Sequence, residues 1–121
     1  MMNTPVPKPV RGDVFSARLD PTEGSEQAGT RPVVVVSRDS INANSPVVVI
    51  VPVTGASNVK RTYPSHAFLP KGSGGLNVDS HAKTEQIRAI QVSRFIGYYG
   101  RLDSEALARI EEAIRITLAL R

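Results

Sequence analysis

The sequence predicts a small, mainly β domain in which one helix lies against a barrel-like sheet. Three observations lead to this fold. The chain has 121 residues, 40% of them hydrophobic but only 5% aromatic, so small aliphatic side chains must fill a single compact core. Short β-branched runs alternate with loops rich in Gly and Pro, which is typical of strands. The last segment is amphipathic with a helical period, so one helix should cover the sheet.

The first ten residues are expected to form a flexible lead-in, and the folded domain is expected to span 11–121. Residues 1–9 contain three of the nine prolines and no periodic pattern. From Val14 apolar and polar residues alternate for a few steps, which predicts the first strand. The polar stretch 20–30, DPTEGSEQAGT, contains two glycines and therefore predicts a loop.

Two β-branched runs, 33–36 and 47–51, predict the centre of the sheet. Each is too short for a helix, so each is expected to be a strand buried on both faces. The polar residues between them predict a connection. If the two strands pair antiparallel, the start of the first and the end of the second lie at the same edge of the sheet. Arg31 and Thr54 could then face one another.

The rest of the chain predicts further strands and the helix. A weaker strand is expected at 66–69, a glycine-rich turn at 70–75 and an alternating strand at 84–92, giving about five strands in all. Asp103 is in the position of an N-cap and Glu105 in the first turn, where a negative charge is favourable. Leu107, Ile110, Ile114 and Leu118 follow at helical spacing.

The basic charge of the chain lies outside this helix. The formal net charge is +4, and segment 103–121 has four acidic residues against three arginines, which leaves +5 on residues 1–102. Eleven of the fifteen cations are Arg, whose planar guanidinium suits bidentate contact with phosphate. An anionic ligand is one interpretation; a basic surface that serves solubility alone is the other.

Several classes of protein are disfavoured. The absence of Cys excludes disulfides and the thiolate ligands of zinc sites, and no spacing of His, Asp and Glu resembles a metal site. Gly72-Ser73-Gly74-Gly75 lacks the Lys of a phosphate-binding P-loop. No apolar run approaches the roughly 18 residues of a membrane span, and the N-terminal stretch lacks a signal-peptide core. A cytoplasmic protein without cofactor or metal is expected.

Taken alone, the residues at the predicted sheet edge leave their role open. Arg31 stands where a polar loop enters an apolar strand, and Pro32 restrains its backbone, so its side chain is well positioned for a site. It could equally be a solvated cation paired with Glu26. A Thr that follows a strand, as Thr54 does, is ordinarily a turn residue.

Several motifs in order resemble the MazF/PemK family of endoribonuclease toxins from type II toxin–antitoxin systems. They are Arg11-Gly12-Asp13-Val14, the segment 21–35 with its Gly-Ser-Glu-Gln loop and Arg-Pro strand, Val51-Pro52-Val53-Thr54, Glu85-Gln86-Ile87-Arg88-Ala89-Ile90, and the closing helix 102–120. The resemblance spans about residues 10–120. It implies a PemK-like fold, a small barrel similar to SH3-like and CcdB-like barrels.

The resemblance further implies cleavage of single-stranded RNA without a metal, by attack of the 2′-hydroxyl, giving a cyclic phosphate and a 5′-hydroxyl. By position, Arg31 and Thr54 are the catalytic pair. A guanidinium and a hydroxyl donor would stabilise the charge that develops on the phosphorane oxygens. Because Arg remains protonated, the general base must be another group, and Glu26 is the candidate for that role or for orienting Arg31.

The residues expected to contact RNA lie on the loop and in the late part of the chain. They are Asp20, Thr22, Ser25, Gln27, Gln86, His81 and Lys83. Loop side chains of this kind can reach the edges of unstacked bases. The segment 80–84 is more polar than the family pattern, so His81 and Lys83 are assigned to RNA contact or base choice rather than to catalysis by His.

The partners implied are a homodimer and a cognate antitoxin whose acidic, partly disordered C-terminal tail competes with RNA for the basic surface. Two other functions remain open: a CcdB-like toxin that poisons gyrase, and a catalytically silent module that binds nucleic acid. Neither needs Arg31 and Thr54 together. Both should survive Arg31→Ala, whereas a ribonuclease should lose its activity.

Overall fold

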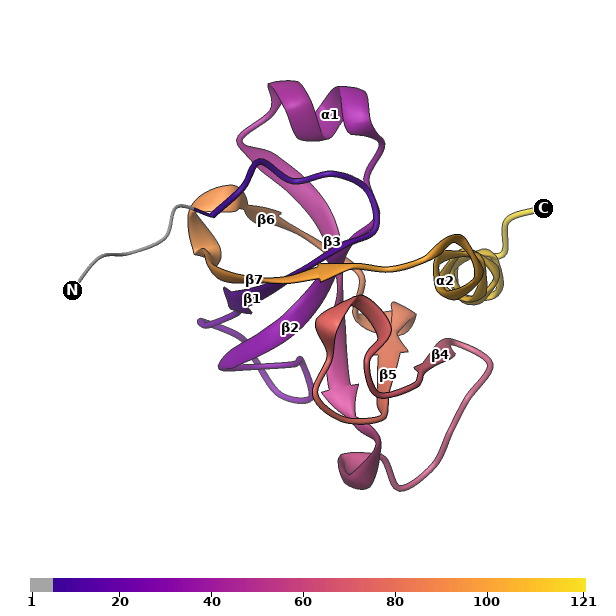
Figure 1. Ribbon diagram of the computed structural model, residues 1–121. Coiled ribbons are helices and arrows are strands. Elements are labelled where there is room, and N and C mark those ends of the chain that lie inside the picture. Colours follow the sequence, from indigo (N-terminus) through magenta and orange to yellow (C-terminus); the bar gives the residue numbers. More distant parts are fainter. Residues whose placement is uncertain (1–5) are drawn as a thin grey trace.

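Seven strands form one antiparallel sheet with a long helix at its side (Figure 1). The chain is described from residue 6 to 121 by a computed structural model. The strands are β1 (Asp13–Arg18), β2 (Thr30–Val35), β3 (Val47–Gly55), β4 (His66–Leu69), β5 (Ser80–Lys83), β6 (Arg88–Gln91) and β7 (Phe95–Arg101). The strand order is β4-β5-β3-β2-β1-β7, with β6 paired to β3. The mainly β class with a C-terminal helix is confirmed.

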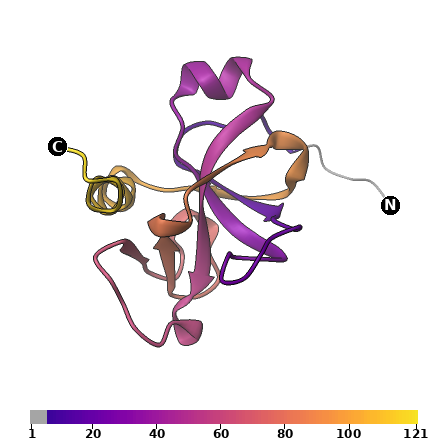
Figure 2. The same ribbon diagram turned by 180° about the vertical axis from the view of Figure 1, so that it is seen from behind.

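The barrel-like sheet is not closed into a full barrel, because the edge strands β4 and β7 do not pair with each other. The reason lies in β3, which is nine residues long. Its first part, from Val47 to Ile50, pairs with β6, and its last residues pair with β5. Figure 2 shows β6 beside the first part of β3, seen from behind. The sheet therefore forks along β3 and stays open.

The two central strands pair antiparallel as predicted, with Val33 opposite Pro52 and Val34 opposite Val51. Alternate residues enter two different cores. Val33 and Val35 pack with Phe15 on one face. Val34 and Val51 pack on the other face with residues of the helix. Both strands are thus buried on both sides, which explains their unbroken β-branched sequence.

The C-terminal helix α2 (Ser104–Leu118) forms as predicted. The Asp103 carboxylate accepts a hydrogen bond of 2.8 Å from the Ala106 backbone N–H, which satisfies a donor that the first turn leaves open. Ala106, Ile110 and Ala113 are buried against the sheet in the cluster that contains Leu69. The helix therefore covers the β4–β5 side of the sheet.

The connection predicted between the central strands contains a short helix, α1 (Asp39–Asn44). This segment has no amphipathic period that would reveal a helix. Its stability comes from a buried polar side chain instead. The Asn42 amide donates to the Ser37 carbonyl oxygen at 2.8 Å, and the Ser37 hydroxyl lies 2.5 Å from Asn42 Oδ1.

The predicted strand at 84–92 is wrong in its first half. Residues Thr84–Gln86 form a 3₁₀ turn, and the strand β6 begins only at Arg88. The buried Thr84 hydroxyl is 2.6 Å from the Ser65 carbonyl oxygen and 3.2 Å from that of Ala113. These contacts draw the chain toward α2 and away from the sheet. The preceding polar residues form the strand β5, which the pattern did not predict.

The strand β7 is also absent from the prediction, because Gly97 and Gly100 weaken its pattern. The turn Ser73–Gly75, predicted only as a glycine-rich turn, comes close to this strand at Gly100, where an added Cβ atom would lie 3.1 Å from the Gly74 carbonyl oxygen. A Cβ atom on Gly75 would lie 2.2 Å from the Tyr99 carbonyl oxygen. The turn therefore packs directly on β7.

The predicted lead-in falls partly on residues 1–5, which lie outside the described residues. Residues 6–10 have no regular structure, but Val6 packs against the Phe15 cluster and Pro9 is buried. Within 6–121, no helix is long and apolar enough to cross a membrane.

Candidate active site

The register of the sheet brings residues from four strands onto one face. The side of β2 that buries Val33 and Val35 also carries Arg31, and the side of β3 that buries Ile50 also carries Thr54. Thr54 lies opposite His81 of β5. In turn, His81 is opposite Phe68 and Lys83 is opposite His66 of β4. Residues far apart in sequence therefore meet at the end of the core.

Arg31 and Thr54 face one another, as the antiparallel pairing predicted. Arg31 Nη1 lies 3.4 Å from the Thr54 hydroxyl oxygen, and Arg31 Nε donates to the Ala28 carbonyl oxygen at 2.8 Å. Thr54 is only 7% exposed, whereas Arg31 is half-buried. The hydrogen bond from Nε to the loop thus orients the guanidinium, so that Nη1 points toward the Thr54 hydroxyl.

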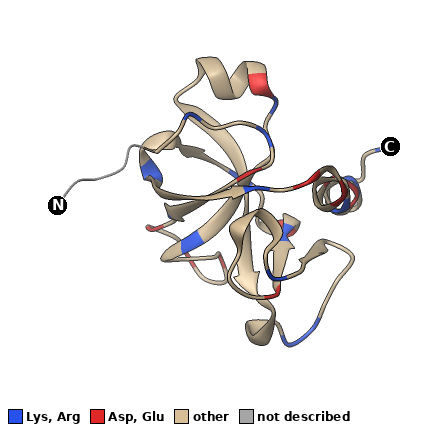
Figure 3. Ribbon diagram, viewed as in Figure 1, with Lys and Arg blue, Asp and Glu red and all other residues tan. Residues whose placement is uncertain are grey.

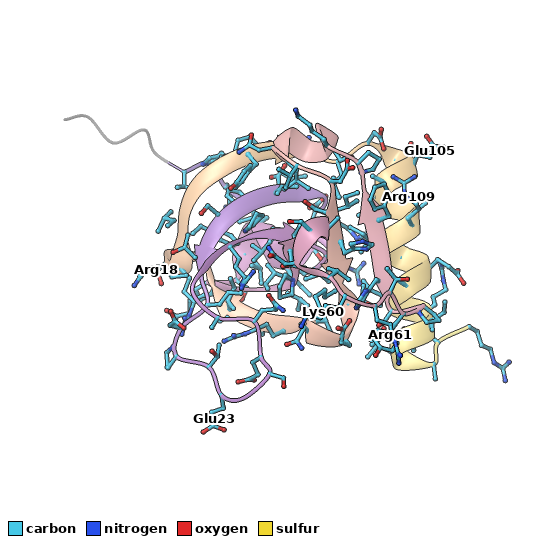
Figure 4. The ribbon with its side chains drawn as sticks, turned by 90° about the horizontal axis from the view of Figure 1, so that it is seen from below. Arg18, Glu23, Lys60, Arg61, Glu105 and Arg109 are labelled. Carbon is cyan, nitrogen blue, oxygen red and sulfur yellow. The ribbon has the colours of Figure 1, made fainter. Side chains whose placement is uncertain are left out.

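The two residues line a pocket of about 400 Å³, called here the Arg31 pocket. The other lining residues come from the loop before β2, the segment between β3 and β4, strands β4 and β5, and the turn after β5; they are Gln27, Asn58, Val59, Lys60, Arg61, Tyr63, His66, Lys83 and Glu85. Four of the lining residues are Lys or Arg, and one is acidic. Figure 4 shows Lys60 and Arg61 between the loop that bears Glu23 and helix α2.

The acidic residue is Glu85, in the 3₁₀ turn that follows β5. Its Oε2 lies 3.3 Å from His66 Nε2 and 4.0 Å from Lys83 Nζ. The His66 side chain is 4% exposed and Glu85 is 36% exposed. The Tyr63 ring meets the edge of His66 at a centroid distance of 5.5 Å. The carboxylate is therefore held against two basic side chains at the wall of the pocket.

His81 lies behind this group and does not line the pocket. It is 9% exposed, and its ring is 5.8 Å from that of His66 and 5.5 Å from that of Phe68. Burial lowers the pKa of His81, and the neighbouring His66 lowers it further. The neutral imidazole is thus favoured. His81 packs against His66, which lines the pocket, and has a supporting role there.

A second pocket of about 450 Å³, called here the Gln86 pocket, adjoins the first. Gln27 and Glu85 belong to both; Ser25, Glu26, Pro52, Gln86, Ile87 and Arg88 complete its lining. The Gln86 side-chain oxygen accepts a hydrogen bond of 3.4 Å from the Gln27 backbone N–H. The buried Gln27 Oε1 has no partner within the described residues. The side-chain amides of Gln27 and Gln86 are therefore available to form hydrogen bonds with a ligand in this pocket.

The other predicted loop residues, Glu26, Asp20 and Thr22, do not line the Arg31 pocket. The Glu26 carboxylate accepts a 2.5 Å hydrogen bond from the Glu23 backbone N–H and lines the Gln86 pocket. Within residues 6–121 it forms no ion pair with Arg31. Asp20 Oδ1 accepts from the Gly29 backbone N–H at 3.2 Å, which closes the loop. Thr22 is half-buried and lines neither pocket.

Sequence-based prediction omitted the segment between β3 and β4. Lys60, Arg61 and Tyr63 are exposed and line the Arg31 pocket. The signal was present, since two adjacent cations followed by an aromatic residue are typical of surfaces that bind single-stranded nucleic acid. Figure 3 shows basic residues along the strands and loops, whereas α2 bears both signs of charge. Among residues 6–121 no group of His, Asp and Glu could hold a metal ion.

Comparison with known proteins identifies the family of the chain. Residues 10–118 match the family described as PemK-like, MazF-like toxin of type II toxin-antitoxin system. The protein named Endoribonuclease MazF9 from Mycobacterium tuberculosis is 40% identical over 115 residues, covering 91% of this chain and 96% of the relative. The protein named Endoribonuclease MazF from Staphylococcus saprophyticus is 38% identical over 110 residues, covering 91% of each chain.

Solved structures agree on the fold. MazF from Deinococcus radiodurans has a TM-score of 0.80 at 25% identity, covering 95% of this chain and 100% of that one. An endoribonuclease in complex with its cognate antitoxin, from a mycobacterial species, has a TM-score of 0.74 at 22% identity and covers 93% of this chain and 97% of that one. With a family match over most of its length and relatives at 38–40% identity, the chain belongs to the PemK/MazF family of type II toxin–antitoxin toxins.

Proposed function

We propose that this chain is a sequence-specific endoribonuclease that cleaves single-stranded RNA in the cytoplasm, without a metal ion, as the toxin of a type II toxin–antitoxin module. The single observation that carries the proposal is the Arg31–Thr54 pair in a pocket lined by four cations. Relatives at 38–40% identity that are named endoribonucleases support it. RNA supplies the phosphate that such a pocket suits.

The reaction is a transesterification within the RNA. The 2′-hydroxyl oxygen attacks the adjacent phosphorus, the P–O5′ bond breaks, and the products are a 2′,3′-cyclic phosphate and a 5′-hydroxyl. Charge builds up on the non-bridging phosphate oxygens in the transition state. Arg31 and the Thr54 hydroxyl stabilise that charge by hydrogen bonds. The bond from Arg31 Nε to the Ala28 carbonyl fixes the guanidinium before RNA binds, so little reorganisation is needed.

Base recognition belongs to the Gln86 pocket in this proposal. Ser25, Gln27 and Gln86 present donors and acceptors to the edges of unstacked bases. Glu26 contributes an acceptor there instead of a catalytic base, because its carboxylate bonds to the loop backbone. Lys83 contacts the RNA backbone in the Arg31 pocket. Asp20 and Thr22 shape the loop, and His81 acts through His66.

The test is to map cut sites by primer extension on a defined long RNA with EDTA present. Wild type should cut at a recurring short sequence, while Arg31→Ala should lose about 10²–10³-fold in rate, the usual cost of removing such a donor. Arg18→Ala is the matched control, because Arg18 is exposed on β1 and lies away from Lys60 and Arg61 (Figure 4). Cutting that requires a metal, or that persists in Arg31→Ala, rules the mechanism out.

The same variants separate the competing functions. A CcdB-like gyrase poison would halt growth without new RNA ends, and Arg31→Ala would stay toxic. A silent nucleic-acid-binding module would bind RNA and leave it intact. The ribonuclease proposal requires that toxicity and cleavage disappear together in Arg31→Ala and remain together in Arg18→Ala.

The partners proposed are a second copy of this chain and an antitoxin with an acidic tail. Strand β7 is an edge of the sheet and exposes Ile96 and Tyr98, which a second copy could cover. The cationic lining of the Arg31 pocket suits an acidic tail. Sedimentation should give a dimer that Ile96→Lys weakens. Inhibition by the antitoxin should weaken about tenfold from low to high salt, since screening acts on such contacts.

A further inference from the structure

A third pocket, of about 260 Å³ and called here the Asn77 pocket, adjoins the Arg31 pocket. The two share Asn58, in the 3₁₀ turn after β3, as a wall. The Gln86 pocket adjoins the Arg31 pocket through two other residues and, among residues 6–121, shares none with the Asn77 pocket. The Arg31 pocket therefore lies between the other two. We infer that the Asn77 pocket binds one base of the RNA, on the opposite side of the cleaved phosphate from the bases in the Gln86 pocket. This inference rests on the ribonuclease function proposed above.

The Asn77 pocket lies on the other face of the strand ends that carry the Arg31–Thr54 pair. Pro32 follows Arg31 on β2, Gly55 follows Thr54 on β3, and both Pro32 and Gly55 line the Asn77 pocket. Successive side chains of a strand point to opposite faces, so the two pockets occupy opposite faces of one sheet edge. An RNA strand whose phosphate lies at Arg31 can thus turn round this edge and place a neighbouring nucleotide in the Asn77 pocket.

The lining of the Asn77 pocket matches a nucleobase, which has apolar faces and a polar edge. Leu76 is buried and forms an apolar floor, and Val78 is 56% exposed. The half-buried ring of Tyr99 packs on the same core cluster as Leu76. Asn58 and Asn77 are exposed, and the amide of each carries a donor next to an acceptor. Such a pair can bind the hydrogen-bonding edge of an unstacked base.

Size and charge both favour a single base over other ligands. A volume of about 260 Å³ is below the roughly 300–1,000 Å³ of pockets that hold drug-sized ligands, so the Asn77 pocket suits one planar ring system. Among residues 6–121 no Lys, Arg, Asp or Glu lines it, whereas four cations line the Arg31 pocket. An acidic antitoxin segment would find no cationic partner there. The phosphates therefore stay with the cations, and the uncharged base enters the uncharged pocket.

Gly55 leaves the Asn77 pocket open, although its backbone does not require glycine. Its φ of −61° and ψ of 140° are extended values that other residues adopt. A Cβ atom there would lie 3.6 Å from Val78 Cγ2 and 3.7 Å from Asn58 Nδ2, which is ordinary van der Waals contact. A larger side chain would therefore occupy the space between Val78 and Asn58. Gly55→Val is thus a way to fill the pocket without straining the backbone.

The decisive experiment measures single-turnover cleavage of a short RNA that contains the preferred cut site, with an abasic ribose placed in turn at each position beside the cut. In wild type, one position on the side opposite to the bases affected by Gln86→Ala should require its base. Cleavage should slow about tenfold when that base is missing, an effect of the size expected for one lost base contact.

Asn77→Ala and Gly55→Val should cut the intact RNA about tenfold more slowly than wild type. Neither should lose more rate on the abasic RNA, because both changes remove the same contact. Asn44→Ala is the matched control and should behave as wild type, since Asn44 is exposed on α1, at the opposite end of β3 (Figure 1). If Gly55→Val slows every substrate alike through its neighbour Thr54, Asn77→Ala decides, because Asn77 lies outside the Arg31 pocket. Thermal unfolding of each variant checks the fold.

Three results would overturn the inference. The first is an abasic effect of equal size in wild type and Asn77→Ala, which would place the base elsewhere. The second is a wild type that requires no base on this side of the cut. The third is an unchanged abasic profile in variants that have lost inhibition by the cognate antitoxin, which would assign the pocket to that protein. If wild type cuts no RNA, the ribonuclease proposal fails as well; if it cuts and only positions on the Gln86 side matter, only the present inference fails.

Discussion

The Arg31 pocket and the Gln86 pocket share Gln27 and Glu85 as a common wall, yet their chemistry differs. The first is lined by four cations, a buried hydroxyl and one carboxylate. The second is lined mainly by loop and turn residues with amide and carboxylate groups, among them Gln86 and Glu26. The difference separates two tasks, charge stabilisation at the phosphate and the reading of bases.

The two pockets also differ in what holds them. Arg31 and Thr54 stand on central strands whose nearby residues Val33 and Val53 are buried, so their separation is set by sheet register. Gln86 and Ser25 stand on a turn and a loop joined by one 3.4 Å hydrogen bond. A site on strands keeps its geometry, whereas a site on loops can change its residues without cost to the core. Substitutions in the loop and turn should therefore change which bases are preferred at the cut site, while the type of reaction stays the same.

Beside the loss expected for Arg31→Ala, the largest effect is expected at Thr54. Thr54→Ala should lower kcat about 10²-fold with KM nearly unchanged, because the hydroxyl acts in the transition state. Thr54→Ser keeps the hydroxyl and should retain most of the rate. Since Thr54 is buried, thermal unfolding of both variants is the control. A rise in KM alone would place Thr54 in substrate binding. It would contradict the assignment of catalysis to the Arg31 pocket and of base recognition to the Gln86 pocket.

A smaller effect is expected in the second pocket. Gln86→Ala should cost about tenfold in kcat/KM at the preferred sequence, corresponding to one lost hydrogen-bonding group. Cut-site mapping should show that the preference is relaxed, while the chemistry at the remaining sites is unchanged. Gln91→Ala is the matched control, because Gln91 is exposed on β6 and lines neither pocket. Uniform slowing at all sites would contradict a role in recognition.

The exposed cations of the Arg31 pocket should act on affinity without regard to sequence. Lys60→Ala and Arg61→Ala should each weaken RNA binding and reduce the slope of log affinity against log salt by about 0.7, the value for one phosphate contact of a single strand. Lys71→Ala, an exposed cation outside both pockets, should leave the slope unchanged. A sequence-dependent loss would instead assign these residues to base recognition.

The smallest effect concerns stability. The pKa of His81 is lowered from its ordinary value of 6.5 in the folded protein, chiefly by burial. The unfolded chain therefore binds the proton more readily, so the free energy of unfolding should fall as pH decreases through that value. Thermal unfolding between neutral and mildly acidic pH should show a smaller decline for His81→Gln than for wild type. An equal decline would mean that other groups dominate.

Local chemistry determined much of this protein from sequence alone. The unbroken valine runs predicted buried central strands. The Asp103 cap and the helical spacing of the apolar residues after it predicted α2. The antiparallel pairing of two adjacent strands was sufficient to bring Arg31 to Thr54. These features depend on neighbours in sequence or on one pairing. The ordered motifs were equally local, and the family they indicated is confirmed.

The tertiary structure alone decided the rest. The open sheet follows from the forking of β3, and the turn Ser73–Gly75 packs on β7 because Gly75 has no Cβ atom that would meet the Tyr99 carbonyl oxygen. The carboxylate nearest to Arg31 in sequence, Glu26, bonds to its own loop, whereas Glu85 reaches the pocket because Thr84 is bound to Ser65 and α2. Such contacts join distant segments through buried polar groups. No local pattern encodes them, since their partners are set only when the chain has folded.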